Sequence, residues 1–314
     1  MRDYRTSYPV IWRVMDVLEA VFAKALPQGG GRMTPYLLLT PAFFLVGALA
    51  VGLLYIGDSS LRVLDRTTFL FSDYYTLENY SRALTERFTY TIIWRSLFGA
   101  VIVTGITLAL AFPYAYVMVR TNNSLLRKFL LIALFLPFFI GQVVRAYGWL
   151  IILGTQGIVN DAIGLVGVEP IRLLFNYPAV LFGLVQYMLP FGVLMLAPAM
   201  TAIPEEVEAA AGSLGANWCK TMWHIVLPMA KPGLIGAGIV VLTLSLTDFA
   251  MPAILGGGSQ DFIANAIYDQ FFRTSDQGFG SALTIMLIAI GSMMIGVVFM
   301  VFGAGTLALG ADEQ

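Results

Sequence analysis

The sequence predicts an all-α membrane protein with six transmembrane helices, and three observations support this fold class. Of the 314 residues, 58% are hydrophobic and only 12% are charged, which is about half the charged share of an average soluble domain. The mean hydropathy is +0.80. Six apolar runs each approach the roughly 20 residues that a helix needs to cross a hydrocarbon core. None alternates polar and apolar residues, which disfavours strands.

Residues 1–33 are predicted to form a cytoplasmic N-terminal segment, because they are too polar to span and no signal-peptide pattern is expected in them. Apolar residues from Val10 to Ala25 recur along one face of a helix. Pro9 suits the first turn of that helix, and Pro27 to Gly31 end it. Such an amphipathic helix lies in the membrane interface or packs against another subunit, and the sequence leaves both open.

The transmembrane domain covers residues 34–310 and is followed by a short cytoplasmic tail, residues 311–314. The six predicted spans are Tyr36 to Gly57, Ser96 to Val119, Phe129 to Leu153, Tyr177 to Met200, Leu234 to Leu255 and Ser281 to Leu309. An even number places both termini on one side. That side carries ten Lys and Arg residues against eight, three of them in the turn from Arg120 to Lys128. The positive-inside rule therefore favours cytoplasmic termini.

Charge and cysteine content exclude several classes of protein. The net charge is -1, whereas nucleic-acid-binding proteins normally carry an excess of Lys and Arg, so the composition disfavours nucleic-acid binding. Cys219 is the single cysteine and His224 the single histidine, which excludes an intramolecular disulfide and a paired-ligand zinc site. Neither residue has a chemical partner in the pattern, and we interpret both as packing or surface residues.

The loop from Thr201 to Gly233 predicts two short helices joined by a turn. Pro204 fits a first helical position, and Glu205 and Glu206 follow it at the positive end of the helix dipole. Gly215 can supply a left-handed turn. Asn217 is a candidate N-cap for a second helix, which Pro228 is expected to end.

Trp218, Met222 and Ile225 are expected to line one face of that second helix. Periodicity alone describes an amphipathic turn between two spans. The spacing from Pro204 through Gly215 to Ile225 and Pro228 resembles the EAA loop of binding-protein-dependent ABC importer permeases. In that family the loop forms a coupling helix that docks on a cytoplasmic ATPase.

The resemblance implies a type I ABC importer permease-like fold and assigns a set of ATPase-coupling residues. They are Pro204, Glu205, Glu206, Glu208, Ala209, Ala210, Gly215, Ile225, Leu227 and Pro228. The sequence departs from the family at one point, because the position of the usual glutamate holds Ala209 and Glu208 stands one residue earlier. Glu205, Glu206 and Glu208 are expected to offer acidic contacts to a basic ATPase surface.

Three further segments resemble the spermidine/putrescine permease branch of the family. They are Leu136 to Trp149, Gly157 to Asp161 and Thr247 to Gly257. The resemblance implies a polyamine or a similar organic cation as substrate. Related branches carry other solutes, so an anionic or amino-acid-like substrate stays open.

The resemblance also implies partners and a location. The chain is expected to pair with a second permease subunit in a heterodimer, with two cytoplasmic ABC ATPases and with a periplasmic substrate-binding protein received by the outer loops. The bacterial inner membrane is the expected location. No GxxxxGK[ST] motif occurs, so we expect no cofactor in this chain and place ATP and Mg²⁺ on the partner ATPase. The resemblance thus implies a transport subunit and not an enzyme.

Asp248 is the main candidate for the substrate pathway. It is the only acidic residue inside the six predicted spans, and a carboxylate in hydrocarbon normally faces a cavity or a partner. Pro252 is expected to kink the helix beside it. At this position Asp248 would attract the ammonium groups of a polyamine.

Five other polar or aromatic residues could line the same passage: Gln142, Arg145, Tyr147, Gln186 and Tyr187. Arg145 would repel a cation, so it either attracts an anionic group or snorkels to the outer headgroups. Tyr147 could hold an ammonium group by a cation–π contact or lie in the interfacial belt, and Trp149 is interpreted as a belt residue. The glutamine and tyrosine side chains could equally cross-link helices.

Two other functions fit the sequence less well. A self-contained ion-coupled transporter needs intramembrane carboxylates or histidines, and Asp248 alone gives it little support. An intramembrane enzyme needs a catalytic constellation, and the spans contain no HExxH, GxSxG or paired carboxylates.

Overall fold

The computed structural model describes residues 34–65 and 70–303, in which the regular structure is helical apart from one isolated bridge between Leu64 and Phe71. The predicted amphipathic helix near the N-terminus and the tail 311–314 lie outside these residues. The chain divides into two compact units, Met1–Tyr55 and Ile56–Gln314. The described part of the first unit belongs to α2 (Thr34–Ser60), which matches the first predicted span.

Three more long helices match predicted spans. They are α4 (Arg87–Arg120), α8 (Tyr177–Thr201) and α15 (Gln277–Val298), and with α2 they are the described single helices long and apolar enough to cross a membrane. α4 begins well before the predicted Ser96, because an apolar run marks the hydrocarbon depth and not the end of a helix. α15 continues into a π-helical turn at Phe299–Gly303.

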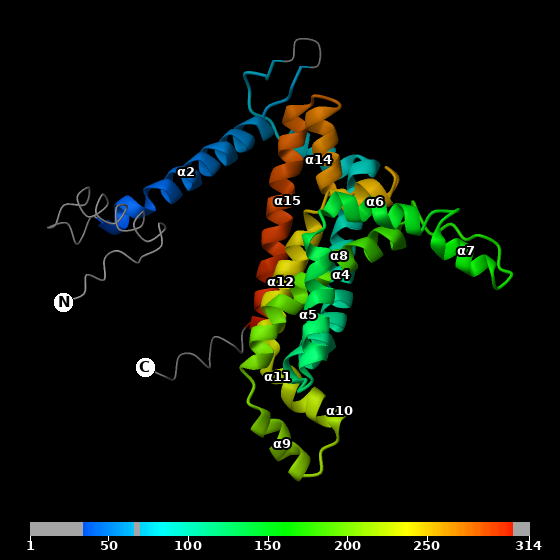
Figure 1. Cartoon of the computed structure of the whole chain (residues 1–314). Helices are drawn as coiled ribbons and strands as arrows, with labels where there is room; N and C mark the ends of the chain where they lie inside the picture. The colour runs from blue at the N-terminus through cyan, green and yellow to red at the C-terminus, as the bar shows by residue number, and fades with distance from the viewer. Residues whose placement is uncertain (1–33, 66–69, 304–314) are drawn as a thin grey trace, which may run out of the picture. The chain divides into compact units, whose positions relative to one another are not determined.

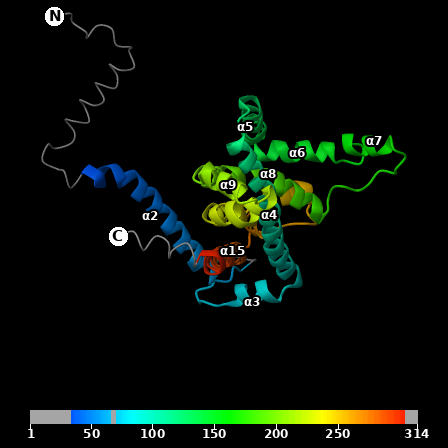
Figure 2. The same cartoon turned by 90° about the horizontal axis from the view of Figure 1, so that it is seen from below.

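The third predicted span is wrong as a single helix. It consists of α5 (Ser124–Phe139) and α6 (Gln142–Ile152), which meet at 101°. Pro137 weakens the last turn of α5 because it lacks an N–H group, and Gly141 is a poor helix former. The bend therefore follows from local chemistry that an apolar composition hides. Figure 2 shows α6 and α7 (Ile158–Gly164) running away from α5.

The fifth predicted span is also broken. α12 (Lys231–Leu246) ends before Thr247, and α13 (Ala250–Leu255) begins after Phe249. In a continuous helix the ring of Pro252 would clash with the carbonyl group of Asp248, four residues earlier. The kink expected from Pro252 is thus a full break, and Asp248 lies inside it.

The core of the second unit is a bundle of α4, α8 and α12, which lie side by side in Figure 1. Small residues let these helices and their neighbours approach closely. A Cβ atom on Gly183 of α8 would lie 2.5 Å from Leu255 Cδ1, and one on Gly99 of α4 would lie 2.7 Å from Phe262 Cζ. Close approach of this kind is typical of helix packing in membranes.

The two ends of the bundle differ in their connections. The loop 201–233 lies at one end, called the hairpin end, and α3 (Glu78–Thr85) and α14 (Ile263–Phe272) lie at the opposite end (Figure 1). α14 packs against α15, so the expected outer loop 256–280 is largely a helical structure. Its Asp276 is buried, caps α15 at Phe279 N and pairs with Arg82 at 3.0 Å.

Candidate functional site

The hairpin at residues 201–233 has the predicted turn. α9 (Glu205–Ser213) follows Pro204, and Gly215 adopts φ +82°, the left-handed conformation that glycine accepts without strain. Asn217 accepts a hydrogen bond from Lys220 N at 2.9 Å and so caps the second helix, as predicted. These local expectations of a helix, a left-handed turn and a cap are confirmed.

The second helix of the hairpin is longer than predicted. α10 (Trp218–Thr221), a π-helical turn (Met222–Val226) and α11 (Leu227–Met229) form one bent pair with α12, at 70°. Pro228 does not end this helix, because the wider π-turn removes the clash that its ring would cause in an α-helix. Leu227 N instead bonds the carbonyl oxygen of Met222, five residues earlier.

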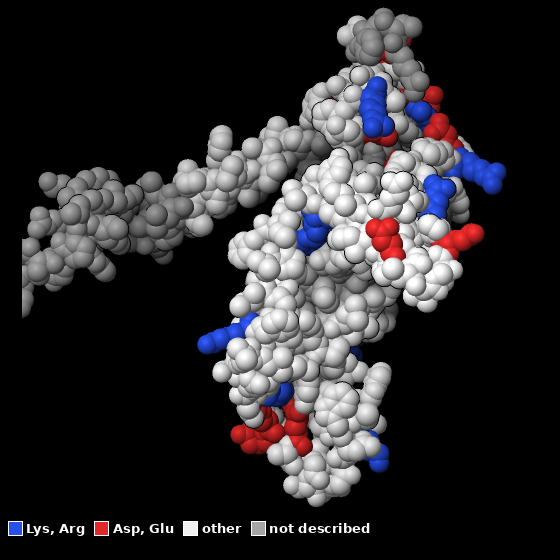
Figure 3. Space-filling model, turned by 45° about the vertical axis from the view of Figure 1, so that its right-hand side comes forward, with Lys and Arg blue, Asp and Glu red and all other residues white. Residues whose placement is uncertain are grey.

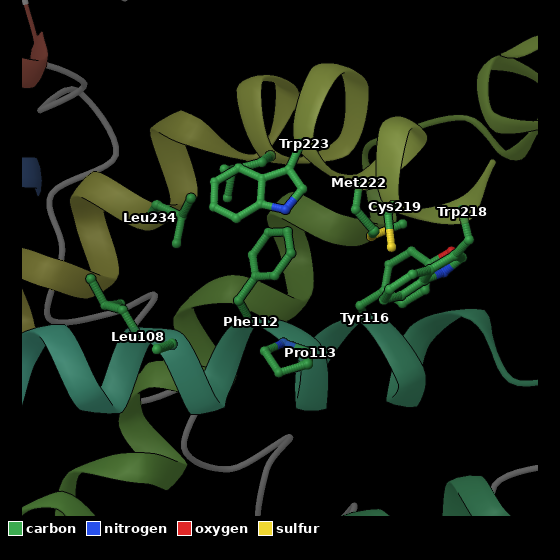
Figure 4. Close-up of a pocket in the computed structure, with 11 residues that line it drawn as sticks. Leu108, Phe112, Pro113, Tyr116, Trp218, Cys219, Met222, Trp223 and Leu234 are labelled. Carbon is green, nitrogen blue, oxygen red and sulfur yellow. The ribbon is translucent and has the colours of Figure 1, made fainter. Parts of the chain in front are cut away.

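The buried face of this helix also differs from the expectation. Met222, Val226 and Ala230 are buried in a core cluster with residues of α4 and α8, whereas Trp218 is exposed. Ile225 and Leu227 are half-buried, and Pro228 is exposed. Beside this face lies an apolar cavity of about 460 Å³ between α4 and the hairpin, lined among others by Phe112, Tyr116, Trp218 and Trp223 (Figure 4).

Glu208 is placed differently from Glu205 and Glu206. Its carboxylate accepts hydrogen bonds from Arg120 Nε at 2.8 Å and from Tyr116 Oη at 2.7 Å, and only 16% of its side chain is exposed. Both oxygens therefore have hydrogen-bond partners within the chain, and the expected contact of Glu208 with an ATPase stays a prediction. Glu205 lies 3.8 Å from Arg120 and is 73% exposed. Glu206, Ala209 and Ala210 are exposed along α9.

Arg120 is a further residue of this site, and its role is not evident from the sequence alone. It was counted only as a positive charge at the membrane edge, but 13% of its side chain is exposed and its Nη2 also donates to Ile203 O at 2.7 Å. Arg120 and Tyr116 stand one turn apart on α4. A Tyr and an Arg at that spacing, on a helix end facing an acidic loop, are the signal that could have identified this contact.

The structure brings together two of the predicted pathway residues, Gln142 and Asp248. Gln142 Nε2 donates to Asp248 Oδ2, while Asp248 Oδ1 accepts from Met251 N at 3.0 Å. The second bond supports the first turn of α13 after the break. Asp248 is 7% exposed, so its carboxylate lies in the interior of the chain.

Arg145 lies one turn after Gln142 on α6, and its snorkelling is ruled out because it is 8% exposed. Its Nη2 donates to Ile140 O at 3.1 Å, and its Cζ lies 5.4 Å from the centroid of the Tyr187 ring. Its Nε and Nη1 are buried with no hydrogen-bond partner in the described structure. A buried guanidinium with two unmet donors is costly.

The remaining predicted pathway residues, Gln186 and Tyr147, have other surroundings. Trp149 Nε1 donates to Gln186 Oε1 at 3.4 Å, and its ring meets Phe182 edge to face at 4.7 Å. Trp149 is thus a half-buried residue of the contact between α6 and α8, and its interpretation as a belt residue stays a prediction. Tyr147 is 55% exposed.

Charged side chains lie mainly toward the two ends of the second unit on the face shown in Figure 3. At the end opposite the hairpin, burial raises the pKa of Asp261, and the neighbouring Asp269 raises it further. No group of three His, Cys, Asp or Glu residues that could hold a metal ion occurs in the part of the chain that the structure describes.

The fold and its hairpin define a class, that of multi-span permease subunits of ABC importers. Residues 101–306 match the family of binding-protein-dependent transport system inner membrane components. The chain belongs to this family. It is therefore a multi-pass membrane protein and a transport subunit, not an enzyme, with ATP hydrolysis on a separate chain.

Characterised relatives are similar over most of their length. The spermidine/putrescine transport system permease protein PotB of Escherichia coli K12 is 32% identical over 70% of this chain and 80% of its own. The PotB protein of Haemophilus influenzae is also 32% identical, covering 77% of that protein. The inner membrane ABC transporter permease protein YdcU of E. coli K12 is 30% identical over 70% of this chain and 78% of its own.

Solved structures share the fold at low sequence identity. A bacterial ABC transporter involved in the import of the acidic polysaccharide alginate gives a TM-score of 0.65 at 16% identity, over 93% of this chain and 98% of that chain. The MetNI methionine ABC transporter in an inward-facing conformation gives 0.53 at 17% identity, over 68% and 94%. These likenesses concern the fold.

Proposed function

We propose that the chain is one of two permease subunits in an ATP-driven importer of a polyamine, such as spermidine or putrescine, or of a similar small organic cation. In this proposal a periplasmic binding protein delivers the solute, two cytoplasmic ATPases drive alternating access, and both termini and the hairpin face the cytoplasm. The similarity to spermidine/putrescine permeases at 32% identity is the observation that carries the proposal.

The chemistry of Asp248 supports a cationic solute. It is the only carboxylate in α4, α5, α6, α8, α12, α13, α15 and the break after α12. Its Oδ2 accepts from an N–H group of Gln142, and an ammonium N–H of a polyamine is a stronger donor of the same kind. The side chain is buried in this conformation, so a solute reaches it only when α6 and α13 separate, as alternating access requires.

Arg145 is the observation that favours a second candidate, an anionic or amino-acid-like solute. Its two unmet donors would suit a carboxylate, and Tyr187 stands within electrostatic reach of both Arg145 and Asp248. A solute carrying both charges would use both residues.

The two candidates are separated by uptake into proteoliposomes that contain the whole complex. We expect radiolabelled spermidine to enter with ATP and its uptake to fall about tenfold or more in Asp248→Asn, since one charge-assisted contact is lost. Ser245→Ala is the control, because Ser245 Oγ is buried one turn earlier without a partner in the described structure. Unchanged spermidine uptake in Asp248→Asn would remove Asp248 from the pathway, and uptake of glutamate instead of spermidine would favour the second candidate.

The role of the hairpin in ATPase docking has its own test. A proline at position 215 cannot adopt the φ of +82° that Gly215 has. In Gly215→Pro we therefore expect the chain still to insert into the membrane but the ATPase no longer to copurify with it. Gly212→Ala is the control, because that glycine has an ordinary φ and open space at its Cβ position. Copurification and uptake retained in Gly215→Pro would count against this hairpin as the coupling element.

A further inference from the structure

The two helices of the hairpin are attached to the bundle in different ways. The second helix buries Met222 and Val226 in the core cluster that includes Ala111 and Ala115 of α4. α9 buries only Ala211. Apolar packing therefore fixes the second helix, while the position of α9 depends on polar contacts.

Those polar contacts come from the last two turns of α4. Arg120 reaches Glu208 Oε1 with both Nε, at 2.8 Å, and Nη2, at 2.7 Å. The same guanidinium holds the carbonyl oxygen of Ile203, just before α9. A planar guanidinium with several acceptors has one orientation only, so this contact fixes α9 in direction as well as in distance.

Tyr116 joins the two hairpin helices to the same segment of α4. Its hydroxyl group donates to Glu208 Oε2 on α9, and its ring meets the Trp218 ring of α10 edge to face at 6.4 Å. Figure 4 shows Tyr116 and Trp218 next to each other at one end of the apolar cavity.

We propose that Arg120, Tyr116 and Glu208 form a clasp that carries movement of the coupling hairpin to α4. The three are positioning residues, and the inference rests on the proposed function of the hairpin as the element that docks on the ATPase. α4 packs along both α8 and α12, and α12 leads directly to the break that holds Asp248. A displacement of α9 would therefore move α4 through the Arg120–Glu208 contact, and α4 would move α12 and the break at Asp248 through the packing of the bundle.

The test measures coupling and not activity alone. The assembled complex is placed in proteoliposomes with its binding protein, and both radiolabelled spermidine uptake and ATP hydrolysis are measured for Glu208→Gln, Arg120→Gln and Tyr116→Phe. We expect the ATPase to copurify and to hydrolyse ATP, while the solute carried per ATP falls about tenfold in the first two variants, a change typical of coupling energies. Tyr116→Phe keeps the ring contact and is expected to fall less.

The exchanged pair Arg120→Glu with Glu208→Arg provides the decisive comparison. The exchange restores an ion pair within the chain, so we expect the amount of solute carried per ATP hydrolysed to recover in part. Lys128→Gln is the control, because Lys128 is an exposed cation on the next helix, α5. Recovery of the ratio supports the clasp, and failure of the exchanged pair to improve on either single variant would overturn it.

Two other results would overturn the clasp while leaving the proposed function intact. Loss of the ATPase from Glu208→Gln would show that Glu208 is a docking contact, and an unchanged ratio in both single variants would show that α9 moves the bundle by another route. If the parent complex itself fails to bind an ATPase or to take up solute with ATP, the proposed function fails before any variant is compared.

Discussion

Arg120 is largely enclosed and Arg145 is buried, each beside the same helical bundle, but their surroundings are opposite. Arg120 has a carboxylate and a carbonyl oxygen within hydrogen-bond distance. Arg145 has one carbonyl oxygen, one aromatic ring and two donors without partners in the described structure. The arrangement around Arg120 favours a single geometry. The arrangement around Arg145 is held by the surrounding helices, and any rearrangement that supplied an acceptor to its two unmet donors would stabilise it.

The largest expected effect comes from breaking the satisfied arginine. Arg120→Met leaves Glu208 nearly buried without its cation, so we expect a loss of about 3 kcal/mol in the free energy of unfolding. The measurement is unfolding of the purified complex in detergent. Arg127→Met is the matched control, because the Arg127 guanidinium donates to the carbonyl oxygens of Val119 and Thr121 and has no carboxylate partner in the described structure. A loss no larger than that of the control would show that the clasp adds nothing to stability.

The second effect concerns the neighbour that satisfies Asp248. Gln142→Leu removes the donor to Oδ2 of a carboxylate that is 7% exposed, and we expect a loss of about 2 kcal/mol. Thermal unfolding followed by tryptophan fluorescence measures it, with the exposed Gln156→Leu as control. Equal stability of the two variants would mean that Asp248 finds another hydrogen-bond partner when Gln142 is absent.

The third effect has the opposite sign. Arg145→Met replaces a buried charge that has two unmet donors by an apolar side chain of similar length, so we expect the resting complex to gain about 1 kcal/mol. Arg172→Met, at an exposed position, is the control. Destabilisation by Arg145→Met would show that the Tyr187 and Ile140 contacts outweigh the unmet donors, and the contrast between the two arginines would disappear.

The smallest effect tests burial of a charge near water. Because burial and Asp269 raise the pKa of Asp261, its ionised form opposes folding, and stability should rise as the pH falls through the folded pKa. Asp261→Asn is expected to remove this rise and to be slightly more stable than the parent at neutral pH. Melting temperatures between about pH 4 and pH 7 measure it, and identical pH profiles for parent and variant would contradict it.

Local chemistry predicted part of this molecule well. Gly215 and Asn217 act through their own backbone neighbours, so the left-handed turn and the cap could be read from the sequence. The breaks at Gly141 and Asp248 were missed, because a run of apolar residues has the same hydropathy whether or not a proline interrupts its hydrogen bonds. Pro252 did indicate a kink, but its size depends on the side chain of Asp248 replacing the lost helical bond.

Tertiary pairing explains the remaining differences. Gln142 and Asp248 were both candidate pathway residues, but they are 106 residues apart in the sequence. The residues around each of them do not indicate that the two side chains pair. Arg120 was assigned to the membrane edge because its charge was read without its partner Glu208, 88 residues away. The functional roles of the coupling and pathway residues stay predictions until the transport experiments are done.

The close approach at Gly183 and Gly99 has a consequence for variation among related proteins. A Cβ atom at position 183 would clash with Leu255, and one at position 99 would clash with Phe262. Even alanine at either position therefore requires the neighbouring side chain to move or to be replaced by a smaller one. Substitutions there should occur in compensating pairs, one helix gaining the volume that the other gives up. The exposed faces of the same helices face no such restriction, so sequence drift in this chain should be concentrated on one side of each helix.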